Sequence, residues 1–490
     1  MSDFNFVGPA YTAPSIYQDC QELINWYIEI DPTKPEGERG RYSFYPMPGL
    51  TTLCTPAVGE VRGLGVSPDG TQMIAIIGNI VYRIDSTYAS IAVGTMMSGT
   101  GPVNITDNSA SAYFVDAYGR YYYTWASGDF AQLPGGDGTW VGGTRADVAD
   151  GFILYGNPSG SQAFSATYPY GSSIDGTGRT SPAGVYGVKS GSGDLLQCLI
   201  VNNRLVYLLG AQSSEVWINS GSAPFSFTLV PGTSTQTGIV APYSVAGFGQ
   251  PPEQTFCFLG QSDTGGGVVY QAKGFNFERV STHAVESDIQ GGVLTDAIGY
   301  SFQMGGHVFY VIVFPTQNKT WVYDDTTKQW AKWLSLDANS NFQRTRVQCT
   351  SYFQGRVVGG DYQNGRIYAL SPTVYTESES TIRRLRRAPH LVSDFRQVAY
   401  KAFQVAFQPG VGLTLGQGND PQVMLRWSDD GGSTWSNEHW TSIGAQGLYK
   451  NRAIWRRLGT ARDRVFEVSI TDPVKAVIVS AELQAKEGAH

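Results

Sequence analysis

The clearest chemical pattern in the chain lies at residues 428–435. Five residues, Ser428, Asp430, Gly432, Thr434 and Trp435, spell S-x-D-x-G-x-T-W, a pattern called an Asp-box. In such a loop the Asp and Ser side chains bond backbone N–H groups of a tight turn, and glycine supplies positive φ. The tryptophan is expected to pack under the turn and pin the flanking strands. We therefore interpret the box as the structural staple of a β-hairpin.

Catalytic alternatives find little support in the residue pattern. A sialidase-like enzyme would need several Asp-boxes at a regular spacing, an arginine cluster for the substrate carboxylate, and a Tyr/Glu pair. The chain has one Asp-box, and its five histidines are not in a metal-ligand spacing. It has no G-x-S-x-G motif and no P-loop. The sequence predicts no enzyme, no cofactor and no metal.

The five cysteines are widely separated and odd in number, and they form no C-x-x-C pair. This usage predicts reduced thiols in a protein made in a reducing cytoplasm. The first residues, MSDFNFVGPA, lack the charged and apolar regions of a signal peptide. The longest apolar run, near residues 307–315, is too short to span a bilayer, so no membrane insertion is expected.

A basic run at Arg383, Arg384, Arg386 and Arg387 is the second candidate site. Guanidinium groups can contact the phosphates of nucleic acid. They can also bridge acidic faces of neighbouring chains in an assembly. The chain is acidic as a whole, with net charge −7. No aromatic stacking platform lies near the run, so inter-subunit contact is favoured over phosphate contact.

The region 59–372 is expected to hold repeated strand pairs. Each repeat ends in an aromatic strand followed by a turn, at Tyr82, Tyr122, Phe164, Trp217, Tyr270, Val322 and Tyr368, with steps of 40 to 53 residues. This period is typical of propeller blades. Seven blades are counted, and six remain an alternative because the third repeat lies in a Gly/Ser-rich stretch around 155–193, which could be an insertion.

Three further segments complete the predicted all-β organisation. Residues 1–58 are expected to form an N-terminal arm that packs on the C-terminal or platform region, with a short helix at 15–23 and a strand at 24–30. Residues 373–389 are read as a charged linker. Residues 390–490 are predicted to form a β-sandwich-like domain that carries the Asp-box hairpin. Charge differs along the chain: residues 1–375 hold 19 Lys and Arg against 29 Asp and Glu, and residues 376–490 hold 15 against 12.

The C-terminal region closely resembles one protein family. The pieces GQGNDPQVMLRWSDDGGSTWSNE, WRRLG and RDRVFEVSITDPVK carry this resemblance, and INWYIEI and the PGL of Pro48–Leu50 support it. The sequence is similar to the tail hub or nozzle proteins of short-tailed bacteriophages, also named packaged-DNA stabilisation proteins. The resemblance is sharp over about a sixth of the chain and loose elsewhere.

The resemblance implies a structural role in the virion, after synthesis in the host cytoplasm. Such proteins form a homohexameric ring or tube below the head-to-tail adaptor. The tube extends the DNA channel, retains the packaged genome and lets double-stranded DNA pass non-specifically at ejection. It also carries fibres or spikes and a needle or plug. The acidic excess of the first 375 residues is expected to line this lumen, since a basic lumen would hold phosphates.

The alternative function is a carbohydrate-binding or sialidase-like propeller that acts on host surface glycans. It predicts that the isolated monomer binds cell-surface polysaccharide. Replacing Trp435 with alanine is expected to cost about 3–5 kcal/mol of C-terminal domain stability, as large-to-small core changes do.

Overall fold

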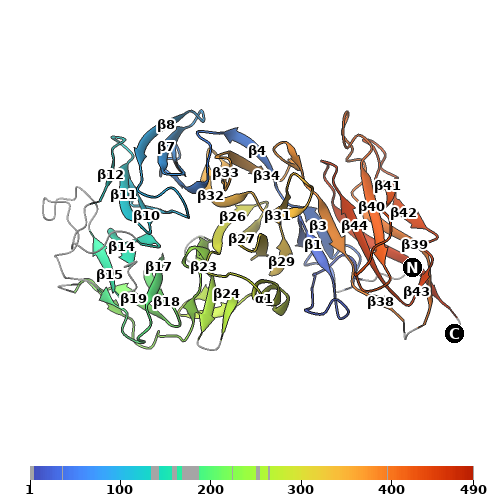
Figure 1. The fold of residues 1–490 in the computed structure, drawn as a ribbon, viewed down its shortest axis with the longest axis horizontal. Helices are drawn as coiled ribbons and strands as arrows, with labels where there is room; N and C mark the ends of the chain where they lie inside the picture. Colours follow the sequence, from blue (N-terminus) through green and yellow to red (C-terminus); the bar gives the residue numbers. More distant parts are fainter. Residues whose placement is uncertain are drawn as a thin grey trace.

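The computed structural model describes residues 5–35, 37–133, 143–156, 163–167, 187–222, 225–249, 254–262, 265–393 and 396–488. Within them the chain forms a propeller and a sandwich side by side, and both chain ends lie at the sandwich (Figure 1). The fold is almost wholly β, as predicted. The described helical elements are the short α-helix α1 (His283–Ile289) and the 3-10 turn η1 (Pro242–Ser244).

Seven sets of antiparallel strands within the described residues form the propeller blades, and the sixth set belongs to a sheet that continues into the sandwich. The first three blades are β5 (Val61–Val66), β6 (Gln72–Ile77), β7 (Ile80–Asp85) and β8 (Ser90–Thr95); β9 (Asn104–Asp107), β10 (Ser111–Asp116), β11 (Gly119–Thr124) and β12 (Phe130–Gln132); and β13 (Ala146–Ala149), β14 (Phe152–Gly156), β15 (Ala163–Thr167) and β16 (Gly187–Val188). The fourth blade is β17 (Leu196–Asn202), β18 (Leu205–Gly210), β19 (Ser214–Asn219) and β20 (Phe227–Leu229).

The last three blades complete the ring. The fifth contains β21 (Gly238–Ile239), β22 (Ala246–Phe248), β23 (Thr255–Ser262), β24 (Gly265–Lys273) and β25 (Asn276–Arg279); the sixth contains β26 (Ile298–Met304), β27 (His307–Phe314), β28 (Lys319–Asp324) and β29 (Gln329–Lys332); and the seventh contains β32 (Val347–Phe353), β33 (Arg356–Asp361), β34 (Ile367–Ser371) and β4 (Gly49–Cys54). The hairpin β30 (Leu334–Leu336) and β31 (Phe342–Arg344) separates the last two.

The aromatic segments predicted from the sequence mark the same place in every blade. They are the third strands β7, β11, β15, β19, β24, β28 and β34. The count of seven blades is therefore correct within the described residues. The predicted insertion around 155–193 falls largely outside those residues, apart from the end of β14, the strand β15 and the segment 187–193.

The seventh blade takes its outer strand from the other end of the propeller sequence. Strand β4 pairs antiparallel with β34, with Leu50 opposite Leu370. Gly49 begins β4 where the chain passes the linker closely, because a Cβ there would lie 2.4 Å from the carbonyl oxygen of Val374. This pairing closes the ring, so residues 49–54 of the expected arm are part of the propeller.

The blade cores follow from strand alternation. Successive side chains of a strand point to opposite faces. In β27, Tyr310, Ile312 and Phe314 pack in the core shared with the fifth blade, where Leu259 and Val269 lie. Residues of the other parity, Phe309, Val311 and Val313, pack with residues of the seventh blade. A blade strand therefore reads as a continuous apolar run, because both of its faces are buried.

The sandwich consists of two sheets that enclose a common apolar core. One sheet has the order β1 (Glu22–Ile24), β37 (Arg384–Arg387), β44 (Asp463–Ile470), β40 (Gln422–Ser428) and β41 (His439–Ser442), with β38 (Leu391–Val392) also beside β44; the other has β2 (Trp26–Ile30), β3 (Tyr42–Pro46), β45 (Ile478–Glu487), β39 (Val398–Phe407) and β42 (Ala453–Arg456), with β43 (Thr460–Ala461) beside β39. The short strands β35 (Thr376–Glu377) and β36 (Ser380–Thr381) extend the seventh blade beyond β4.

The arm and the linker are built into both domains. Strand β1 pairs in parallel with β29 of the sixth blade and antiparallel with β37 of the sandwich, so one sheet continues from propeller to sandwich. The helix predicted at 15–23 is wrong: Cys20 forms a β-bridge with Thr12, and Glu22–Ile24 enters this sheet. The linker prediction also needs correction, because Arg384–Arg387 is an interior strand.

Candidate functional site

The Asp-box forms a loop closed by its own side chains. Ser428, the last residue of β40, donates its hydroxyl to Asp430 Oδ1 at 2.6 Å and accepts the Gly432 N–H at 2.8 Å. Asp430 accepts the backbone N–H and the hydroxyl of Thr434, at 2.8 and 2.6 Å. The hairpin partner β41 begins only at His439. All of these groups are used to hold the loop, which supports the structural interpretation.

Trp435 is not the core residue that the sequence predicted. Its ring is half-buried outside the strands, and the guanidinium groups of Arg387 and Arg426 lie over it at 4.8 and 4.7 Å from its centroid. Its Nε1 donates to the carbonyl of Gly432 at 3.1 Å. The ring therefore covers an arginine pair on the outer face of a sheet and does not fill the sandwich interior.

We expect Trp435→Ala to lower the free energy of unfolding of the sandwich by about 1–2 kcal/mol. This figure reflects the two cation–π contacts, each about 0.5–1 kcal/mol when partly exposed, and replaces the core-residue estimate. Chemical unfolding followed by circular dichroism measures it. A loss of 3 kcal/mol or more would show that the ring is packed as a core residue after all.

The arginine pair shares one buried carboxylate. Glu467 on β44 is 1 % exposed, and it accepts Arg387 Nε at 2.9 Å and Arg426 Nε at 2.6 Å. The three residues are direct cross-strand neighbours on β37, β44 and β40. Two positive charges against one negative charge leave a net positive site, which the electron-rich face of Trp435 covers.

The other arginines of the basic run have different surroundings. Arg384 and Arg386 are 0 % exposed, so in this chain neither is available to phosphate or to a neighbouring subunit, contrary to the sequence interpretation. Strand alternation is the reason, since both point to the same face as their partners Ile470 and Val468 of the sandwich core. Arg383 remains partly exposed and lies 4.0 Å from Glu438.

The buried arginines bind backbone carbonyls in place of carboxylates. Arg384 donates to the carbonyls of Tyr375 and Asp472, at 3.3 and 3.4 Å. Arg386 donates to the carbonyl of Phe6 at 2.7 Å and to Gln21 Oε1 at 2.8 Å. Because burial disfavours the charged form, it lowers the pKa of Arg384 to about 10 and that of Arg386 to about 9. Arg386 thereby holds the N-terminal segment onto β37.

The hydrogen bonds to Asp430 make the Asp-box pH-sensitive. The hydroxyls of Ser428 and Thr434 and the Thr434 N–H lower the pKa of Asp430 from 3.8 to about 2. The folded state therefore gains stability from this group above the unfolded pKa and loses it as pH falls through the folded pKa. We expect the stability difference between wild type and Asp430→Asn to shrink from pH 4 to pH 2 in unfolding experiments.

A matched control for this titration is Ser433→Ala, which changes an exposed neighbour in the same loop without adding or removing a titrating group. It should keep the pH dependence of the wild type. A constant difference between wild type and Asp430→Asn over the whole interval would contradict the assignment.

Two important residues gave no clear sequence signal. Arg464 is buried and forms two hydrogen bonds to Asp429, at 2.6 and 2.7 Å, across 35 positions of sequence. Asn25 interrupts the predicted strand 24–30 with φ of 62°, and its side chain bonds the N–H and carbonyl of Leu334 and the carbonyl of Arg383 at 2.7–2.8 Å. Asparagine tolerates positive φ, which is the one hint that the sequence offered.

The structure also shows the surroundings of the cysteines and of the remaining acidic residues. The five cysteines are free thiols, and burial raises the pKa of each one. Asp324 accepts a turn N–H from Thr326. Over the part of the chain that the structure describes, no His, Cys, Asp and Glu side chains cluster in threes as metal ligands. In that same part, every helix is too short or too polar to cross a bilayer.

The arrangement is a propeller joined by a continuous sheet to a sandwich, and the polar groups described above hold loops and the N-terminal segment in place. Comparison of the sequence with protein families identifies the family. The family described as bacteriophage P22 Gp10 matches twice, its β-propeller over residues 29–375 and its β-sandwich over residues 383–486. The chain belongs to this family of phage tail hub or nozzle proteins and is a structural protein of the virion.

Two other comparisons add less. Among solved structures, the WD40 β-propeller domain of Doa1 is similar at 9 % identity, with a TM-score of 0.39, over 66 % of this chain and 97 % of that one. No curated protein sequence matches this chain.

Proposed function

We propose that six copies of the chain form a ring or tube in a short phage tail, below the head-to-tail adaptor. The ring extends the DNA channel, retains packaged DNA and conducts it during ejection. The observation that supports this proposal is the match of one tail-protein family to both domains, over residues 29–375 and 383–486.

The junction between the domains suits a subunit of a tube that transmits force. The sheet that runs from the sixth blade through β1 into the sandwich fixes the two domains to each other. Asn25 and the ion pair of Lys332 with Glu22, at 3.1 Å, reinforce it. A rigid two-domain subunit can transmit force from the adaptor to the distal tail without bending.

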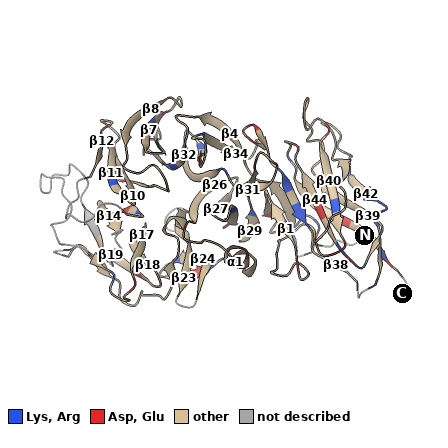
Figure 2. Cartoon of the chain, viewed as in Figure 1, with Lys and Arg blue, Asp and Glu red and all other residues tan. Residues whose placement is uncertain are grey.

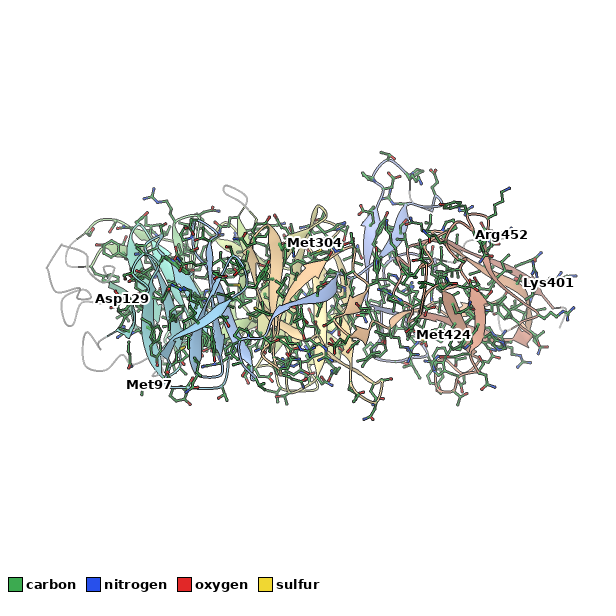
Figure 3. The ribbon with its side chains drawn as sticks, turned by 90° about the horizontal axis from the view of Figure 1, so that it is seen from above. Met97, Asp129, Met304, Lys401, Met424 and Arg452 are labelled. Atoms are coloured by element: carbon green, nitrogen blue, oxygen red, sulfur yellow. The ribbon has the colours of Figure 1, made fainter. Side chains whose placement is uncertain are left out.

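The charge distribution suggests how the subunit is oriented. Residues 1–375, which include the propeller, carry the acidic excess, and charged residues are sparse over its ribbon (Figure 2). In the proposed ring this acidic region faces the lumen, where it does not retain phosphates. The exposed Lys401 and Arg452 lie at the end of the sandwich remote from the propeller (Figure 3). This end is proposed to meet the adaptor, the fibres or spikes, or the needle.

Electron microscopy of the purified chain mixed with its adaptor tests the proposal. We expect sixfold rings whose lumen is lined by residues of net negative charge. Asn25→Ala should reduce the fraction of particles that form rings, because it removes hydrogen bonds at the junction of the two domains while leaving each core intact. Asn339→Ala, a change at an exposed residue, should not reduce it. Particles without rotational symmetry, or a net positive lumen, would contradict the proposal.

A further inference from the structure

A cavity of about 220 Å³ lies at the centre of the propeller, between the innermost strands. Six of the seven blades contribute to its lining, and the fourth does not. The described residues that line it include two arginines, Arg62 and Arg145, and no Asp or Glu. The cavity exceeds the space of a single water, about 30 Å³ of liquid volume, several-fold.

The guanidinium group of Arg62 is occupied by interactions within the protein. Its guanidinium donates to the carbonyls of Gly101, Ser98 and Thr100 at 2.6–2.9 Å and lies 3.3 Å from the buried carboxylate of Asp116. These bonds fix the chain between the first and second blades. The positive charge of Arg62 is thus compensated, and the residue is not available to a ligand.

Arg145 is different, because its guanidinium donates one hydrogen bond to the described residues. Its Nη1 donates to the carbonyl of Val245 at 3.2 Å, and its Nε is buried without a hydrogen-bond partner. Asp147 is its nearest carboxylate, 3.9 Å away, but that oxygen already accepts the Val201 N–H at 2.9 Å. A charged guanidinium with unused donors at a cavity wall is suited to a carboxylate ligand.

In Gln348 the unpaired group is a hydrogen-bond acceptor, whereas in Arg145 it is a donor. Its Nε2 donates to Glu60 Oε1 at 2.8 Å and to the Val61 carbonyl at 3.0 Å. Both partners are acceptors, which fixes the orientation of the amide. Its Oε1 is therefore left as a buried acceptor without a donor, on a residue that is 3 % exposed. An unpaired buried acceptor is costly, so a ligand that brings an O–H group gains affinity here.

We propose that this central cavity binds a small hydroxylated carboxylate of the size of one acidic sugar. The carboxylate bonds Arg145, and a hydroxyl group donates to Gln348 Oε1. The remaining wall mixes hydroxyl groups, such as that of Tyr243, with apolar faces, as ligand pockets do. The proposal stands on the cavity alone and does not depend on the tail role.

Titration of the full-length chain with D-glucuronate, D-glucose and propionate tests this proposal, using calorimetry or ligand-detected NMR. Glucuronate should bind at least about tenfold more tightly than either probe that lacks one of the two groups. Arg145→Met should weaken glucuronate binding about tenfold or more and leave glucose unaffected. Gln348→Met should weaken the binding of glucuronate but not that of propionate.

Arg204→Met is the matched control, since Arg204 has a side chain 82 % exposed and paired with Asp150. It should bind glucuronate as the wild type does. Arg145→Lys keeps the charge and should retain part of the affinity, and circular dichroism confirms the fold of each variant. Absence of glucuronate binding by the wild type at about 10 mM, or equal affinity for glucose, overturns the proposal whatever the variants do.

Discussion

Replacing Trp26 with alanine is expected to lower the free energy of unfolding of the sandwich by about 3–5 kcal/mol. Trp26 lies in β2 and is fully buried. Its ring stacks on Phe44 at 6.2 Å between centroids, and its Nε1 donates to the Ala476 carbonyl at 2.9 Å. The substitution leaves both a cavity and an unpaired buried carbonyl, and each is destabilising.

Urea unfolding followed by circular dichroism measures this effect. Trp440→Ala is the matched control, because Trp440 is 61 % exposed on the edge strand β41, and it should change stability by no more than about 0.5 kcal/mol. Equal effects of the two substitutions would show that residues 26–30 are a detachable arm and not part of the sandwich core.

The fold was predictable where it repeats locally and not where it joins distant segments. The third strand of each blade carries an aromatic residue next to a turn, so the seven-fold pattern is visible in sequence. The pairing of β4 with β34 and of β1 with β29 joins segments that are far apart in the chain, and short strands such as Glu22–Ile24 have little periodicity of their own. The sequence therefore showed an arm and a linker where the structure has shared sheets.

The candidate site also has a part that could be predicted from the sequence and a part that could not. The Asp-box is local, since Ser428, Asp430 and Thr434 bond one another within seven residues, and its loop was predictable. Burial was not, because it depends on which face of a sheet a residue occupies. Trp435 lies on the outer face, and Arg384 and Arg386 on the inner face, although tryptophan is more often the buried type.

Arg386→Ala is expected to release the N-terminal segment and to cost about 3–5 kcal/mol of sandwich stability. The loss combines unpaired acceptors at the Phe6 carbonyl and Gln21 with a cavity in the core. Hydrogen exchange should be faster over residues 5–24 than in the wild type, and the urea unfolding midpoint should fall. Arg383→Ala, in the same basic run but partly exposed, should change stability by less than about 1 kcal/mol.

Arg386→Met separates the two contributions to this loss. Methionine keeps most of the volume beside the rings of Phe6 and Phe44, which lie 5.8 and 5.4 Å from the guanidinium, but it cannot donate hydrogen bonds. If the bonds to the N-terminal segment dominate, Met and Ala variants should both expose residues 5–24 to exchange. If residues 5–24 of the Met variant were as protected from exchange as in the wild type, the free energy lost by burying the guanidinium charge would equal the free energy gained from its hydrogen bonds. The segment would then be held by apolar packing, and Arg386 would not be its anchor.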